Sequence, residues 1–116
     1  MSLPRVTKFA TGLSLVLTAL GVCAADTVVV APELWDRPRS GQIVLEQPAL
    51  KQVVKAYLGQ PGVRLIIHHA ARQESLLHAE ELRAWLVALA VEAERIALRA
   101  SLHAGEPLKI EVVTSQ

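Results

Sequence analysis

Cysteine, aromatic residues and serine are all scarce in this chain of 116 residues. The single cysteine, Cys23, lies near the N-terminus, and aromatic residues make up 3% of the chain. If the chain is processed after residue 25, the remainder contains no cysteine, which excludes disulfide bonds and thiol chemistry there. None of the later serines (Ser40, Ser75, Ser101 and Ser115) stands in a Gly-x-Ser-x-Gly motif. No catalytic residue is therefore predicted, and we do not expect an enzyme.

A large excess of charge of one sign is also missing. The chain has 12 Lys and Arg against 11 Asp and Glu, and Arg5 and Lys8 are the only charged residues before residue 26. No segment gathers a cluster of basic residues together with several aromatic ones, which argues against nucleic-acid binding. A basic amphipathic helix that would bind a membrane surface is absent as well.

The first 25 residues have the pattern of a signal peptide. Arg5 and Lys8 precede an apolar run over residues 9–22, and the small residues Ala24 and Ala25 follow it. The run is shorter than the roughly 20 residues that span a bilayer, so no transmembrane segment is predicted. We expect cleavage after Ala24 or Ala25 and a periplasmic location. The alternative is a lipid anchor at Cys23, for which Val22 is a poor preceding residue.

The processed chain is long enough for one small domain, which we divide into an N-terminal strand and loop region (26–46) and the main domain (47–116). Two segments of the first region, residues 27–30 and 43–45, are strand candidates. Trp35 is expected to pack on the domain, with stacking on a ligand as the alternative.

Hydrophobic periodicity defines the elements of the main domain. It predicts a helix over residues 48–58, a strand over 63–68 and a second helix from about residue 74. After Arg95 the apolar spacing changes from helical to alternating, which indicates a new strand. Residues 95–102 and 108–114 are predicted to form an antiparallel hairpin. The fold class is α/β (α+β): a two-layer sandwich in the order βαβαββ, with helices on one face of a mixed sheet.

Four stretches in this order resemble the OmpA-like domain family, which binds peptidoglycan and includes MotB-like stator domains. They are "QPGVRLIIHHA", "ELRAWLVALAVEAERI", "AGEP" and "LKIEVV". The family has a Gly-His-Thr-Asp-like loop after its central strand and a "Leu-x-x-x-Gly-Val-x-x-x-Arg-Ile" motif that leads into a later strand. The resemblance implies the same βαβαββ fold and covers residues from about 50 to 113.

The family's ligand loop is altered in this sequence. His69 stands at the family's histidine, but Ala71 replaces the aspartate that, with a helix arginine, clamps the zwitterionic end of diaminopimelate. Matching "RA" directly places that arginine at Arg83, whereas counting back from the later motif places His78 there. Arg83 is favoured because it preserves the chemistry, and Glu74 could replace the carboxylate. The predicted ligand-binding residues are Arg83, His69 and Arg72.

No metal or cofactor is predicted. His68 and His69 are neighbours in a strand and should point to opposite faces, so they cannot readily hold one metal ion together. The resemblance implies a periplasmic, non-catalytic domain that binds peptidoglycan weakly or through an altered ligand set. The alternative is a structural or interaction protein that has lost peptidoglycan binding and docks on an envelope protein partner.

Overall fold

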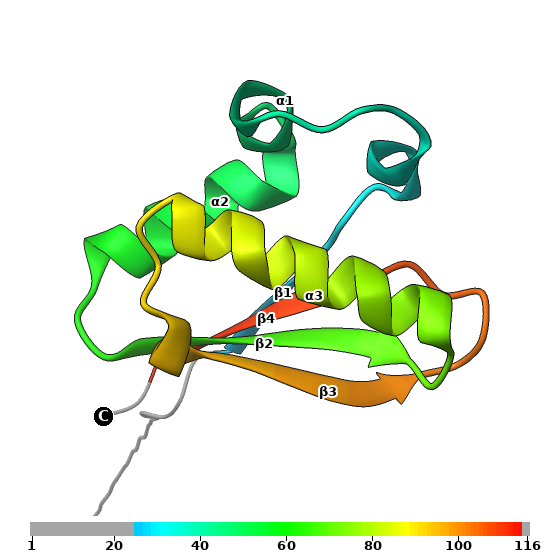
Figure 1. Cartoon of the computed structure of the whole chain (residues 1–116). Helices are drawn as coiled ribbons and strands as arrows, with labels where there is room; N and C mark the ends of the chain where they lie inside the picture. Colours follow the sequence, from blue (N-terminus) through cyan, green and yellow to red (C-terminus); the bar gives the residue numbers. More distant parts are fainter. Residues whose placement is uncertain (1–24, 115–116) are drawn as a thin grey trace, which may run out of the picture.

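The computed structural model describes residues 25–114, which contain both helices and strands (Figure 1). The first half contains β1 (Ala25–Val29), the 3-10 helix η1 (Pro32–Asp36), α1 (Gly41–Leu45) and α2 (Pro48–Gly59). The second half contains β2 (Val63–Ala70), α3 (Gln73–Ala88), the 3-10 helix η2 (Ala93–Arg95), β3 (Ile96–Leu102) and β4 (Lys109–Thr114). Apart from the short helices η1, α1 and η2, this is the predicted order βαβαββ.

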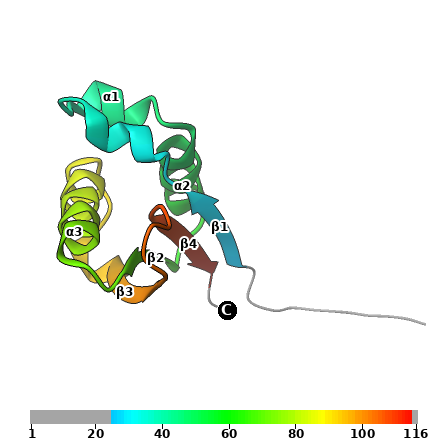
Figure 2. The ribbon, with the colours of Figure 1, turned by 90° about the vertical axis from the view of Figure 1, so that its right-hand side faces the viewer.

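The four strands form one mixed sheet in the order β1-β4-β2-β3. Strand β4 pairs antiparallel with both β1 and β2, whereas β2 and β3 are parallel. Within the described residues, α2 and α3 cover one face of this sheet, and the other face carries no helix (Figure 2). The domain is therefore the two-layer α+β sandwich that the sequence predicted.

Alternation along β2 explains how the sheet meets the helices. Val63, Leu65 and Ile67 are at most 2% exposed, while the residues between them are more open. On the helix side, Leu50 of α2 and Leu82 of α3 are fully buried against this surface. Each such side chain contributes about 1.5–3 kcal/mol by leaving water, so the apolar periodicity determines which face of each element turns inward.

The predicted hairpin between residues 95–102 and 108–114 is wrong, although both strands exist. Strand β2 lies between β3 and β4 in the sheet. Next-but-one strands are about 10 Å apart, which the loop of residues 103–108 can cross. Ile110 of β4 is fully buried, whereas most of β3 is exposed, so the more apolar strand occupies the centre and β3 the edge.

The N-terminal region also corrects one strand prediction. Residues 27–30 overlap β1, but residues 43–45 belong to the helix α1. Ser40 caps this helix, because its hydroxyl accepts a hydrogen bond from the Ile43 amide at 3.2 Å. Val44 is the buried residue of this short helix. One inward apolar side chain fits a capped helical turn as well as a strand, which explains why the sequence pattern was misinterpreted.

No helix within residues 25–114 is long and apolar enough to cross a membrane. The predicted signal peptide lies outside the described residues except for Ala25, and Cys23 also lies outside them.

Candidate functional site

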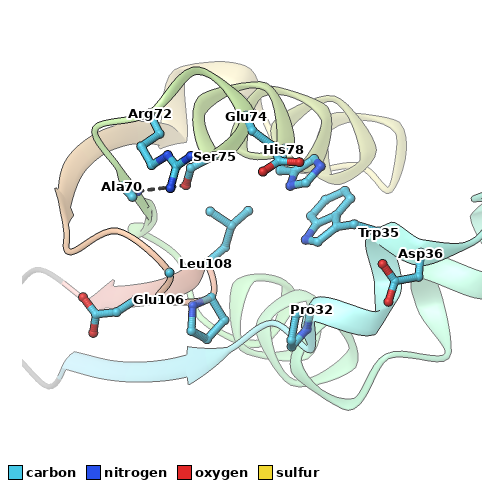
Figure 3. Close-up of a pocket in the computed structure, with 12 residues that line it drawn as sticks. Pro32, Trp35, Asp36, Ala70, Arg72, Glu74, Ser75, His78, Glu106 and Leu108 are labelled. Atoms are coloured by element: carbon cyan, nitrogen blue, oxygen red, sulfur yellow. Dashed lines mark hydrogen bonds between the residues drawn. The ribbon is translucent and has the colours of Figure 1, made fainter.

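A pocket of about 280 Å³ lies where the β2–α3 connection, η1 and the β3–β4 loop meet (Figure 3). It is open to solvent on one side and combines apolar walls with charged groups. The lining residues are Pro32, Trp35 and Asp36 of η1, Ala70 and Arg72 of the connection, Glu74, Ser75 and His78 of α3, and residues 105–108. The connection that the sequence analysis compared with a family ligand loop therefore forms one wall of a cavity.

The connection between β2 and α3 is held in place by its backbone. The register of β2 against β3 shifts between His69 and Ala70, where β2 ends. The Ser75 hydroxyl accepts a hydrogen bond from the Ala70 amide at 2.8 Å, which ties the end of the strand to the first turn of α3. Arg72 is the N-cap residue of α3 in an extended conformation, and no side chain caps this end of the helix. The positive end of the α3 dipole is therefore left for another acceptor.

Opposite charges border the pocket at the start of α3. Arg72 and Glu74 both line it, and within the described residues neither side chain has an ion-pair or hydrogen-bond partner. Glu106 is already engaged, because its carboxylate accepts the His103 amide at 2.6 Å. Arg72 and Glu74 therefore offer a free guanidinium and a free carboxylate, which can bind a carboxylate and an ammonium group respectively.

His69 does not line the pocket. Its side chain points to the helix-covered side, where the residue is 7% exposed, and its Nδ1 lies 2.8 Å from the Ala70 carbonyl oxygen. Since a carbonyl oxygen only accepts, this ring nitrogen donates the hydrogen bond. His69 therefore supports the end of β2 from inside the domain.

Of the two positions considered for the helix arginine, the structure brings His78 to the pocket. Arg83 lies further along α3, half-buried and outside the lining residues. The predicted site residues are thus separated: Arg72 borders the cavity with Glu74 and His78, whereas Arg83 and His69 do not.

Trp35 forms the wall opposite Arg72 and packs as predicted, but within the pocket. Its indole ring stacks on the His78 imidazole with centroids 4.4 Å apart and planes within 2°, and the Arg39 guanidinium carbon lies 5.3 Å from the ring centroid. These contacts cover the ring and hold η1 beside α3. The sequence contained no periodic signal for this contact, because it joins a residue of the short helix η1 to a helix formed later in the chain.

An ion pair next to the pocket fastens the same segment to α3. Arg39 donates to both carboxylate oxygens of Glu81, at 2.5 and 3.0 Å, and the Trp85 indole N–H donates to one of them at 3.0 Å. The hydrogen bond from Arg39 holds the pKa of Glu81 below its ordinary value, although partial burial acts in the opposite direction. Glu81 in turn raises the pKa of Arg39.

The two adjacent histidines point to opposite faces of the sheet, as strand alternation predicted. His68 lies on the helix-free face, between Ser101 of β3 and Glu111 of β4. In residues 25–114, no three His, Cys, Asp or Glu side chains come together in a way that could hold a metal ion.

Within the described residues, the pocket presents a free cation (Arg72), two free carboxylates (Glu74 and Asp36) and an uncapped helix end. This arrangement is suited to binding a small zwitterionic group. Membership of the OmpA-like family remains a prediction from the sequence. No family model, curated protein or solved structure matches this chain.

Proposed function

We propose that this chain is a periplasmic binding domain whose pocket holds the zwitterionic end of a peptide, with peptidoglycan stem peptides as the ligand. The observation that carries the proposal is the pair of unpartnered, oppositely charged side chains, Arg72 and Glu74, at the pocket wall. The arginine fork suits a ligand carboxylate, and the uncapped N-terminus of α3 adds to the attraction. Glu74 suits the ammonium group at the other end of the same amino-acid unit.

This pair would replace the clamp of the family that the sequence resembles. Ala71, which stands at that family's aspartate, is exposed and brings no carboxylate. Glu74 is the second residue of α3, and its carboxylate would supply the negative charge that the family's aspartate provides. Arg72 and Glu74 lie at a pocket that is open to solvent, so water and salt screen their interactions with the charged groups of a ligand. This screening supports weak binding through an altered ligand set.

The second candidate is an interaction protein that docks on an envelope protein partner. The alanine at position 71 favours it, since the family's ligand carboxylate is lost there. The two candidates differ in one measurable property, which is affinity for the cell wall itself.

Sedimentation with purified sacculi that contain diaminopimelate tests the proposal, using the chain without its first 25 residues. We expect the wild type to sediment with sacculi and free diaminopimelate to compete. Arg72→Gln and Glu74→Gln should each weaken binding about tenfold or more, because a hydrogen bond to a charged group contributes roughly 1.5–3 kcal/mol.

Arg83→Gln is the matched control, because it removes the same charge outside the pocket and should bind like the wild type. An equal loss in Arg83→Gln and Arg72→Gln would instead support the assignment made from the sequence. If the wild type stays in the supernatant with and without sacculi, peptidoglycan binding is refuted and the interaction protein remains.

A further inference from the structure

A hydrogen-bonded chain of three side chains crosses the helix-free face of the sheet. Ser101 Oγ lies 2.5 Å from His68 Nδ1, and His68 Nε2 lies 2.9 Å from Glu111 Oε1. The three residues come from adjacent strands, because β2 lies between β3 and β4 in the sheet. These three residues lie on the opposite face of the sheet from the helices that line the pocket. The hydrogen-bonded side chains are therefore independent of the ligand binding proposed above.

The partners determine where the imidazole proton lies. An ionised carboxylate can only accept hydrogen bonds, so His68 Nε2 must donate to Glu111. In a neutral ring the other nitrogen, Nδ1, then carries a lone pair and accepts from the Ser101 hydroxyl. A base that faces a serine hydroxyl and is oriented by a carboxylate is the arrangement that activates serine as a nucleophile.

The strand geometry also favours access to this hydroxyl. The register pairs His69 with Ala100 and Ala70 with Leu102, which leaves Ser101 as the extra residue of β3 at the shift. Such irregularities re-aim a side chain and are frequent next to active sites. Ser101 is exposed, whereas the side chains of His68 and Glu111 are 15% and 26% exposed. The Ser101 hydroxyl is therefore accessible to solvent, while the His68 side chain that would act as its base is largely buried.

The charged residues next to these three side chains indicate which acyl donor would suit the serine. Arg99 of β3 and Lys109 of β4 both pair in register with His68, one from each side. Lys109 also pairs with Glu106 at 3.8 Å, whereas Arg99 has no ion-pair partner within the described residues. A free cation beside the base favours a donor that is itself anionic, because it attracts the donor's charged group and stabilises the charge that the leaving group takes with it.

We propose that Ser101 is a nucleophile for acyl transfer, with His68 as its general base, Glu111 as the residue that positions the base, and acyl phosphates as the donor class. Ser101 Oγ forms a bond to the acyl carbon while its proton passes to His68 Nδ1. The bond from the acyl carbon to the phosphate oxygen breaks, and phosphate leaves with the electron pair. The product is an O-acyl serine.

Site-resolved acetylation of the full chain tests this proposal. The chain is incubated briefly with acetyl phosphate, quenched in acid and analysed by peptide mass spectrometry. Ser40 and Ser75 are internal controls, because their hydroxyls accept backbone amide hydrogen bonds and, among the described residues, contact no base. Ser101 should acetylate on the order of tenfold to 100-fold faster than either, as expected for general-base assistance.

His68→Gln and Glu111→Gln should bring Ser101 down to the level of Ser40, whereas His103→Gln, a change of an exposed loop histidine, should leave the ratio unchanged. A variant that fails to fold would expose all serines, so their acetylation rates would become equal and higher than in the folded protein. Circular dichroism identifies such an unfolded variant. In that case His68→Asn or Glu111→Asn, which also removes the base or the carboxylate, replaces it and should lower the Ser101 rate in the same way.

Two results would overturn the proposal: acetylation of Ser101 no faster than that of Ser40, or an unchanged Ser101 rate in folded His68 variants. The donor class is tested by repeating the comparison with neutral p-nitrophenyl acetate. The Ser101 to Ser40 ratio should be higher with acetyl phosphate and should fall in Arg99→Gln; equal ratios would exclude the preference for an anionic donor.

Discussion

At the scale of single residues, Glu81 is the clearest contributor to how the N-terminal segment is held. Its carboxylate accepts from Arg39 and Trp85, with side chains of the ion pair 24% and 32% exposed. Because this partial exposure screens the charges, we expect Glu81→Gln to lower the free energy of unfolding at neutral pH by about 1 kcal/mol. Urea denaturation of the wild type and the variant measures this difference.

The same residue gives the prediction a pH dependence. The folded-state pKa of Glu81 is lowered from 4.5, so its contribution is complete well above pH 4.5 and is lost as the pH falls toward the folded pKa. The difference between wild type and Glu81→Gln should therefore shrink in acid. Glu80→Gln is the control, because Glu80 is exposed and has no ion-pair partner in the described part of the chain. A constant difference at all pH values would contradict the assignment.

Residue-level predictions from the sequence held where they depended on local geometry. Strand alternation correctly placed His68 and His69 on opposite faces, but it could not say what either side chain meets. Ser101 and Glu111 reach His68 only because β3 and β4 lie on either side of β2, which is a property of the sheet order. The pocket wall formed by Trp35 and His78 likewise joins residues whose proximity no spacing encodes.

At the scale of elements, the end of α3 contains a residue in an unfavourable conformation. Ala90 has φ = 84°, the left-handed region, immediately after the C-cap residue Leu89. Glycine adopts this conformation without steric cost, and the motif of the family that the sequence resembles has glycine here. We expect Ala90→Gly to raise the free energy of unfolding by up to about 1 kcal/mol, measured by chemical denaturation.

Ala84→Gly is the matched control for Ala90→Gly, because Ala84 is exposed inside α3 with ordinary helical neighbours. The same substitution there should destabilise the domain by about 1 kcal/mol. Opposite signs for the two variants support the left-handed conformation, and destabilisation at both positions would contradict it.

The helices and strands with repeated apolar positions could be predicted from the sequence, and the short α1 could not. Pro48 and the spacing of Leu50 and Val53 define α2, and alternation defines β2. In contrast, α1 contains one buried residue, Val44, so a single turn has too few positions to separate a period of 3.6 from a period of 2.

At the scale of the whole molecule, strand order is the feature that the sequence did not specify. A six-residue connection with Gly105 and Pro107 is compatible with a hairpin and also with a crossing over β2. The choice is made by burial: placing β4 between β1 and β2 buries Ile110 and Val112, which an edge position would leave open on one side. This competition involves the entire sheet, and periodicity within one segment carries no information about it.

Native-state hydrogen exchange tests whether β4 is a central strand. Strands β2 and β4 each have neighbours on both sides, so their amides should exchange only on global unfolding, while β3 has one neighbour and should have a set of fast amides along its free edge. The deciding observation is protection along β4: both the Ile110 and Glu111 amides should be slow, because successive amides point to β1 and β2 in turn. Alternating fast and slow amides along β4 would show that it is an edge strand and would refute the order β1-β4-β2-β3.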